Sequence, residues 1–287
     1  MDATFERAQL AAQAIEGMIS DFSMALMDCM LACQQRAGVG GHIVEFGVYK
    51  GKSAAILANR SRDQERLVLV DINSQIDAAK ISALFPTFEF VEWPSEHFRE
   101  KVNDYDGLQR NCRFIHVDSS HGYRTTLHEL ALCESLAASQ SIIVLDDFTN
   151  LDYSQILAAV YKYLYTIKTN LCVFLVTADK AYLCPKADFE HYADYVLKDL
   201  LADMGNRGLG DLCIARTDWD PEYRAFSLRR RAPGDSGQFY GENLYGQFYK
   251  CPNMEPQTPA APAERTPRSF AQRIGMAANA IFSRRKI

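Results

Sequence analysis

Three separate groups of acidic side chains give the sequence its strongest chemical signal. Glu45 lies in one short apolar run, Asp118 follows a second such run, and Asp146 and Asp147 follow a third. Carboxylates that converge repel one another and raise each other's pKa unless a cation or a proton lies between them. A hard divalent ion such as Mg²⁺ accepts oxygen ligands of this kind. Asp118, Asp146 and Asp147 are therefore predicted to form a metal site, unless one of the adjacent pair only caps a helix.

A glycine-bearing stretch, 45–53, joins an apolar run to a helical segment. Gly47 and Gly51 let the backbone turn sharply and approach a ligand, although a plain turn between a strand and a helix explains them equally well. Asp71, twenty residues after Gly51, follows the next apolar run. An acid in that place either accepts hydrogen bonds from ribose hydroxyls or caps the next helix. Tyr49 stands where a dinucleotide loop has its middle glycine, which argues against a pyrophosphate ligand.

The elements that must position these residues alternate along the chain. Five short apolar runs separated by helical segments predict a parallel sheet with both faces covered. Two further runs are separated by only four residues, too few for a helical crossover, and predict an antiparallel hairpin. Ligands bind beyond the carboxyl ends of such strands. The predicted strands are 42–46, 67–70, 88–91, 112–117 and 141–145, and the hairpin pairs 171–176 with 181–184.

The motif Glu-Phe-Gly-Val-Tyr-x-Gly-x-Ser at 45–53, with the acids above, resembles class I S-adenosylmethionine-dependent methyltransferases. The branch that it is most similar to is that of metal-dependent small-molecule O-methyltransferases of the macrocin and catechol types. The resemblance implies a Rossmann-like α/β fold with a mostly parallel seven-stranded sheet, a C-terminal antiparallel hairpin and helices on both faces. It implies S-adenosylmethionine as cofactor and a hydroxyl of a small molecule, such as a sugar or secondary metabolite, as acceptor.

The resemblance also implies roles for single residues. Glu45 would hold the amino group of the cofactor, Asp71 its ribose and Ser95 its adenine. The acids after the fourth and fifth strands would hold Mg²⁺ or another divalent cation against the substrate hydroxyl. The residues implied in cradling the methionine part of the cofactor are Gly47, Tyr49, Gly51 and Ser53.

His121 stands three residues after Asp118, where the catechol-type enzymes carry a lysine that acts as base. Histidine can take a proton near neutral pH. Asp118 can also take the proton, which would leave His121 to orient the substrate, and a structural histidine bonded to the backbone is the third interpretation. The sequence leaves the choice of base open.

Charge and composition narrow the classes of partner. The chain has 31 basic and 36 acidic residues among 287, a formal charge of −5, which gives no general attraction for nucleic acid. Its eight cysteines lack metal-site spacing and are expected to be reduced in a cytoplasmic protein. A basic C-terminal helix allows membrane contact, which we do not expect, and a homodimer is the commonest assembly.

Four regions are predicted, of which the second is the catalytic core. The segment 237–250, rich in glycine and aromatic residues, and the N-terminal helices are expected to cover the acceptor site or a subunit contact. The regions are the N-terminal helical segment 1–37, the S-adenosylmethionine-binding core 38–186, the C-terminal extension and candidate lid 187–251, and the proline-rich linker with terminal basic helix 252–287.

Three alternative functions remain at this stage. Methyl transfer to nitrogen or to protein would need no metal. A module that binds the cofactor without catalysis would need no carboxylate cluster, so the three aspartates count against it. An NAD-dependent dehydrogenase would need a pyrophosphate loop, which Tyr49 disfavours.

Overall fold

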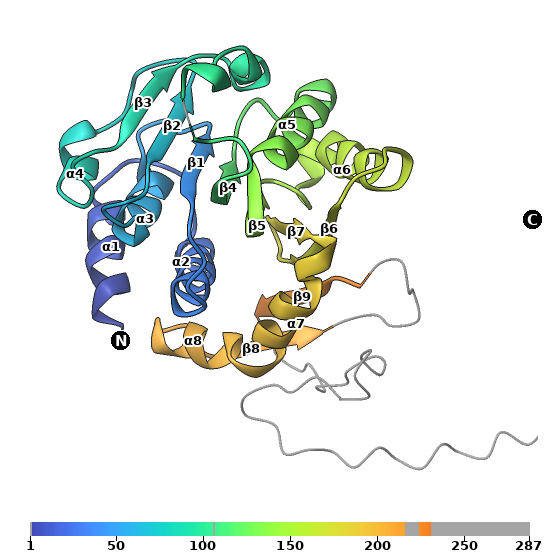
Figure 1. The fold of residues 1–287 in the computed structure, drawn as a ribbon. Helices are drawn as coiled ribbons and strands as arrows, with labels where there is room; N and C mark the ends of the chain where they lie inside the picture. Colours follow the sequence, from blue (N-terminus) through green and yellow to red (C-terminus); the bar gives the residue numbers. More distant parts are fainter. Residues whose placement is uncertain (1, 106, 216–223, 231–287) are drawn as a thin grey trace, which may run out of the picture. The chain divides into compact units, whose positions relative to one another are not determined.

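A mixed nine-stranded sheet organises the residues that the computed structural model describes, which are 2–105, 107–215 and 224–230 (Figure 1). The chain divides into two units, Met1–Asn253 and Met254–Ile287, and the second lies outside the described residues. The sheet order is β3-β2-β1-β4-β5-β7-β6-β9-β8. Its strands are β1 (His42–Phe46), β2 (Leu67–Asp71), β3 (Glu89–Glu92), β4 (Cys112–Val117), β5 (Ala137–Leu145), β6 (Leu171–Val176), β7 (Ala181–Pro185), β8 (Leu212–Ala215) and β9 (Phe226–Arg230).

The predicted parallel core and hairpin are both confirmed. The first five strands pair in parallel, and β7 pairs antiparallel with both β5 and β6. Two strands extend the predicted seven, because β9 pairs in parallel with β6 and antiparallel with β8. The described part of the predicted extension 187–251 thus lengthens the sheet. The segment 237–250 and the tail 252–287 lie outside the described residues.

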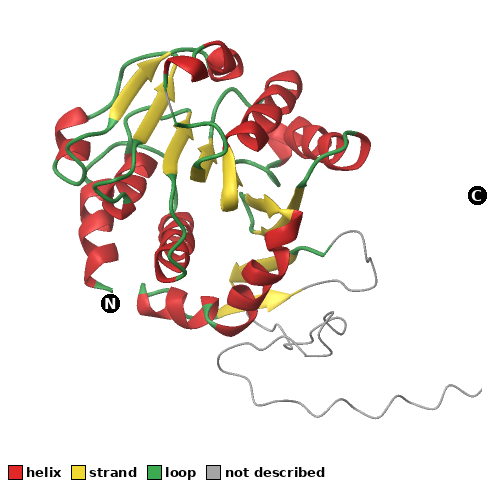
Figure 2. Cartoon of the chain, in the orientation of Figure 1, coloured by secondary structure: helices red, strands yellow, loops and turns green. Residues whose placement is uncertain are grey.

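Helices cover both faces of the sheet (Figure 2). One hydrophobic cluster joins one face to α1, α2, α3, α7 and α8, and a second joins the other face to α5, α6 and the 3₁₀ turn η1. The described residues contain no helix long and apolar enough to cross a membrane. The helices are α1 (Ala3–Gln13), α2 (Asp21–Arg36), α3 (Lys52–Arg60), α4 (Ala78–Ser82), α5 (Tyr123–Leu136), α6 (Ser154–Thr166), α7 (Phe189–Lys198) and α8 (Leu200–Asn206), with 3₁₀ turns η1 (Ser95–Glu100), η2 (Val102–Asp104), η3 (Leu151–Tyr153) and η4 (Lys186–Asp188).

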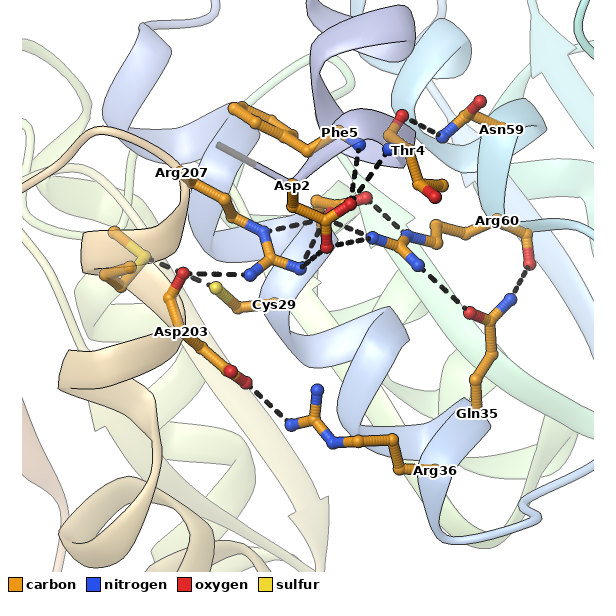
Figure 3. Close-up of polar contacts among 12 residues, drawn as sticks. Asp2, Thr4, Phe5, Cys29, Gln35, Arg36, Asn59, Arg60, Asp203 and Arg207 are labelled. Carbon is orange, nitrogen blue, oxygen red and sulfur yellow. Dashed lines mark hydrogen bonds and ion pairs between the residues drawn. The ribbon is translucent and has the colours of Figure 1, made fainter.

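Buried ion pairs join the N-terminal helices to α8 (Figure 3). Asp28 of α2 is fully buried, and its Oδ2 accepts hydrogen bonds from Arg60 Nη2 and from Arg207 Nε, each at 2.7 Å. Asp2 caps α1 through Oδ1, and its Oδ2 lies 3.4 Å from Arg60 and 3.5 Å from Arg207. A buried charge is tolerated only when it is paired. One carboxylate of α2 therefore holds two guanidinium groups from segments far apart in the sequence.

Removing that carboxylate is expected to destabilise the fold strongly. Asp28→Ala leaves two largely buried guanidinium groups without their main partner and should lower the free energy of unfolding by about 3 kcal/mol. The control is Lys198→Ala, which breaks an ion pair with Asp194 whose side chains are 62% and 58% exposed, and should cost less than about 0.5 kcal/mol. Urea unfolding measures both. Equal losses in the two variants would contradict the role given to Asp28.

Candidate functional site

The carboxyl ends of β1, β4 and β5 form one edge of the sheet. β4 pairs in parallel with both neighbours, and Val117 lies opposite Phe46 and Leu145. The next residues, Asp118 and Asp146, therefore emerge side by side, with a carboxyl oxygen of each within 4.8 Å of the other. The structure thus brings together two of the three aspartates that the sequence predicted to converge.

Gly47 lies against this edge where no side chain would fit. Its φ is +81°, and a Cβ at this position would lie 1.9 Å from the carbonyl oxygen of Asp118. The backbone after β1 thus passes in contact with the backbone after β4, which accounts for the glycine by packing alone. Gly51, with φ +92°, immediately precedes α3. A Cβ at this position would lie 3.2 to 3.5 Å from the side chains of Ile76 and Ile81.

Asp71 holds the loop between β1 and α3. Its Oδ2 accepts hydrogen bonds from the backbone N–H groups of Val48 and Tyr49 at 2.7 and 2.8 Å. It does not cap the next helix, because Asp77 caps α4. The Tyr49 hydroxyl donates to Glu16 at 3.0 Å, so the connection between α1 and α2 contacts the same loop. Ser53 is buried in the first turn of α3.

Glu45 lies deeper than the sequence analysis assumed. Its carboxylate is fully buried, and Oε1 lies 2.7 Å from Nδ1 of His116, which is also fully buried. Glu45 Oε2 and His116 Nε2 have no hydrogen-bond partner among the described residues. The histidine of this pair was not identified from the sequence, because only the register of β1 against β4 places it opposite Glu45.

A second residue missed by the sequence analysis, Lys180, contacts the acidic edge. It is 1% exposed, and its Nζ forms an ion pair with Asp146 Oδ1. Burial lowers the pKa of Lys180, but the negative charges of Asp146 and Asp118 outweigh burial, and its pKa is raised overall. The ammonium group is therefore charged at neutral pH.

The pKa values of Asp118 and Asp146 are shifted in opposite directions. Burial, and then the charge of Asp146, raise the pKa of Asp118 to about 7. Its side chain remains 36% exposed, so water offsets part of this effect. Burial also acts to raise the pKa of Asp146, but Lys180 outweighs it and holds that pKa at about 2. Of the two carboxyl groups, Asp118 is the one able to gain and lose a proton near neutral pH.

Asp147 contacts His121, whose Nε2 also lies 3.6 Å from Oδ1 of Asp118. Asp147 Oδ2 lies 2.7 Å from His121 Nε2, and its Oδ1 accepts from Asn150. His121 Nδ1 contacts the carbonyl oxygen of Ser119, and the ring stacks at 4.5 Å from that of Tyr153. Both ring nitrogens therefore contact oxygen atoms of neighbouring residues, which fixes the orientation of the ring.

Ser95 lies at the start of η1, where its hydroxyl donates to the buried carboxylate of Glu129. Ser119 donates to the same carboxylate. Burial raises the pKa of Glu129, and the two hydroxyls partly counteract this. Glu129 of α5 was not predicted, because its contacts depend on how α5 packs against η1.

The predicted magnesium ligands do not come together as a group of carboxylates free to bind a metal ion. His116, Asp118 and Asp146 each offer a ligand atom, and these atoms lie within 4.8 Å of one another, but Asp147 is outside this group. His116 Nδ1 is bonded to Glu45, and Asp146 already has the Lys180 ammonium as its counter-ion. Mg²⁺ prefers oxygen ligands and retained water. The side chains therefore do not fit a three-carboxylate magnesium site.

A separate hollow of about 820 Å³ lies at the opposite, amino-terminal edge of β4 and β5. Its lining includes Arg110, Glu134 and Lys186 and none of the predicted site residues. Size alone therefore does not locate the site, because the two neighbouring carboxyl groups whose pKa values shift in opposite directions, Asp118 and Asp146, lie at the carboxyl edge.

The contact at Gly47 predicts an unusually large cost for adding a methyl group. Gly47→Ala introduces both a positive φ and a clash with backbone, and should lower the free energy of unfolding by about 3 kcal/mol. Gly38→Ala is the matched control, because Gly38 has φ +70° and nothing within 4 Å of its Cβ position; strain alone should cost about 1 kcal/mol. Thermal and urea unfolding report both values. A Gly47 variant no less stable than the control would refute the close approach.

Comparison with known proteins identifies the central part of the chain. Residues 44–148 match the family model described as a methyltransferase domain. No curated protein matches the chain. The match begins in β1 and ends just after Asp147, so it contains the acidic edge apart from Lys180.

Solved structures of similar fold include three methyltransferases. An O-methyltransferase from Bacillus cereus in complex with SAH has 15% identity, covers 64% of this chain and 90% of its own, and has a TM-score of 0.48. The Podospora anserina methyltransferase PaMTH1, bound to SAH, has 15% identity, covers 64% and 88%, and scores 0.45. CalS11, a TDP-rhamnose 3'-O-methyltransferase of calicheamicin biosynthesis, has 17% identity, covers 63% and 92%, and scores 0.46. These similarities are too distant to carry an argument about activity.

The sheet order and the family match identify the same region. Five parallel strands followed by an antiparallel hairpin are the outline of the class I methyltransferase fold, and the matched residues span β1 to the end of β5. Residues 44–148 therefore match a methyltransferase domain, and the sheet that contains them has the strand order of the class I methyltransferase fold.

Proposed function

We propose that this methyltransferase transfers the methyl group of S-adenosylmethionine to a hydroxyl of a small molecule. The observation that carries the proposal is the state of Asp118. It stands at the carboxyl end of β4, where an open parallel sheet binds its ligands, and its pKa is raised to about 7. A group of this pKa can take the proton that a hydroxyl loses on methylation and release it afterwards.

The proposed reaction is a single displacement. The acceptor oxygen attacks the methyl carbon, the new C–O bond forms as the bond from carbon to the sulfonium sulfur breaks, and the electron pair of that bond stays on sulfur. The products are a methyl ether and S-adenosylhomocysteine, and the hydroxyl proton passes to Asp118. Holding the two substrates in line supplies much of the rate enhancement.

The surroundings of His121 support an organic acceptor with an apolar surface. Tyr123 and Tyr153 are each 39% exposed and Leu151 is 90% exposed, and all three belong to the segments after β4 and β5. Rings exposed beside a polar edge suit a small molecule that offers both a hydroxyl and an apolar face, such as a sugar or an aromatic metabolite. His121, fixed between Asp147 and Ser119, is proposed to orient the acceptor.

The cofactor is proposed to bind on the β1 side of the edge. Asp71 ends β2 and the exposed Ile72 follows it, where ribose and adenine would lie, and Ser95 comes after β3. Glu45 keeps one carboxylate oxygen without a partner among the described residues, which suits an interaction with the amino group of the cofactor. The loop residues proposed to contact its methionine part are Gly47, Tyr49, Gly51 and Ser53.

Metal assistance is the part of the sequence prediction that the geometry supports least. Two of the three predicted ligands, Asp146 and Asp147, already contact other side chains, the Lys180 ammonium and the His121 ring. The proposal therefore retains the hydroxyl acceptor and assigns no step to Mg²⁺. A cytoplasmic location and a homodimer remain predictions.

The test of the base is a substitution that preserves shape. Asp118→Asn should still bind S-adenosylmethionine by calorimetry and lower turnover by about a hundredfold or more, because the proton has no acceptor. Turnover is measured as transfer of a labelled methyl group to a panel of sugars and phenols. Asp194→Asn, at an exposed site on α7, is the control and should keep full activity.

Two results would count against the proposal. Full turnover of the Asp118→Asn variant would show that Asp118 is not the base. Wild-type transfer only to amines or to protein would show that the acceptor is not a hydroxyl.

A further inference from the structure

Lys180 is fixed opposite the acidic edge by strand pairing. β5 and β7 run antiparallel with Leu145 opposite Ala181, so the residues beyond them, Asp146 and Lys180, face each other. The Lys180 ammonium meets the Asp146 carboxylate and also acts on Asp118. Only 1% of its side chain is exposed. The Lys180 ammonium thus lies beside the carboxylates that the sequence predicted to bind a metal ion.

The turn before β7 holds Lys180 rigidly. The Thr177 hydroxyl accepts from the Lys180 backbone N–H at 2.9 Å and donates to Asp179 at 2.8 Å. The other oxygen of Asp179 accepts from Ser23 of α2 at 2.7 Å. The lysine is therefore set by the hairpin turn and by α2, both outside the region that matches the methyltransferase family model.

We propose that Lys180 is a positioning residue that supplies the counter-charge of the acidic edge, so that the enzyme transfers methyl groups without a divalent metal. The inference deepens the proposed function and rests on it. Lys180 acts through Asp146: its ammonium pairs with that carboxylate and holds it in place beside Asp118.

A count of charges favours this arrangement over a metal. Asp118 and Asp146 ionised, with Lys180 protonated, give a net charge of −1 at the edge. That charge complements the single positive charge of the sulfonium on the methyl donor. Adding a divalent cation would make the edge +1 and would repel the donor. After the hydroxyl proton reaches Asp118, the edge is neutral.

A purely structural ion pair would also bury Lys180, so the test needs a readout that a structural role would not change. That readout is dependence on metal. Lys180→Met keeps an unbranched side chain that is one atom shorter and removes the charge, which leaves two carboxylates without a counter-ion. Such a pair should then bind a divalent cation.

The experiment compares wild type, Lys180→Met and Lys186→Met, with Mg²⁺ alone as the probe. Lys186 lies outside the site, where its Nζ donates to the carbonyl oxygen of Thr169. Wild type and the Lys186 control should show no heat of Mg²⁺ binding and no change in thermal midpoint with millimolar Mg²⁺. Lys180→Met should have a lower midpoint that Mg²⁺ raises.

Activity gives the second readout. Without metal, Lys180→Met should lose roughly a hundredfold in kcat while its affinity for S-adenosylmethionine does not weaken, and Mg²⁺ should restore at least part of kcat. If the variant does not fold without metal, its refolding is followed with Mg²⁺ present: recovery supports the proposal, and failure to recover overturns it.

The outcomes separate this inference from the proposed function. Mg²⁺ binding to the wild type, or wild-type methyl transfer that a chelator abolishes, would overturn the role of Lys180 and leave hydroxyl methylation standing. A wild type that methylates no hydroxyl would overturn the proposed function, and the thermal shifts would still report whether Lys180 balances the carboxylates. A Lys180→Met variant that behaves like Lys186→Met in every assay would overturn the inference.

Discussion

The ion pair between Lys180 and Asp146 allows two carboxyl groups to lie at adjacent strand ends. Neighbouring acids in a partly buried place repel each other and need a cation or a proton between them. Here the ammonium keeps Asp146 ionised, and burial together with the charge of Asp146 raises the pKa of Asp118. One contact, made from the turn of the β6–β7 hairpin, thus distinguishes the two acids: Asp146 carries a fixed charge, and Asp118 can exchange a proton.

The fold places this edge through close backbone contacts. Gly47 allows the end of β1 to touch the end of β4, and the Asp71 carboxylate draws the next two backbone N–H groups toward the end of β2. Behind the edge, the buried pair of Glu45 and His116 links the same two central strands. Farther away, Asp28 holds Arg60 and Arg207, so that α2, α3 and α8 form one support for that face of the sheet. Helix α2 therefore contributes both to this support, through Asp28, and to the turn that holds Lys180, through the bond from Ser23 to Asp179.

The order of elements could be predicted because each strand is a short apolar run and each crossover has a helical pattern. The convergence of Asp118 and Asp146 followed from parallel pairing alone. Lys180 could not be found this way, since its approach depends on the antiparallel pairing of β5 with β7, which a local pattern does not specify. His116 and Glu129 were missed because register and helix packing decide their contacts. Asp147 adjoins Asp146 in sequence, but a backbone φ of +52° turns it toward His121.

The most direct test of the account is calorimetric titration of the purified protein with S-adenosylmethionine and, separately, with NAD, each with Mg²⁺ and then with chelator. The loop after β1, with Tyr49 in place of a glycine and Asp71 at its base, should bind the methyl donor and not the dinucleotide. Equal binding of the methyl donor with and without chelator is the predicted result. Binding of NAD, or of neither molecule, would contradict the assignment of this loop and of the chemistry placed beside it.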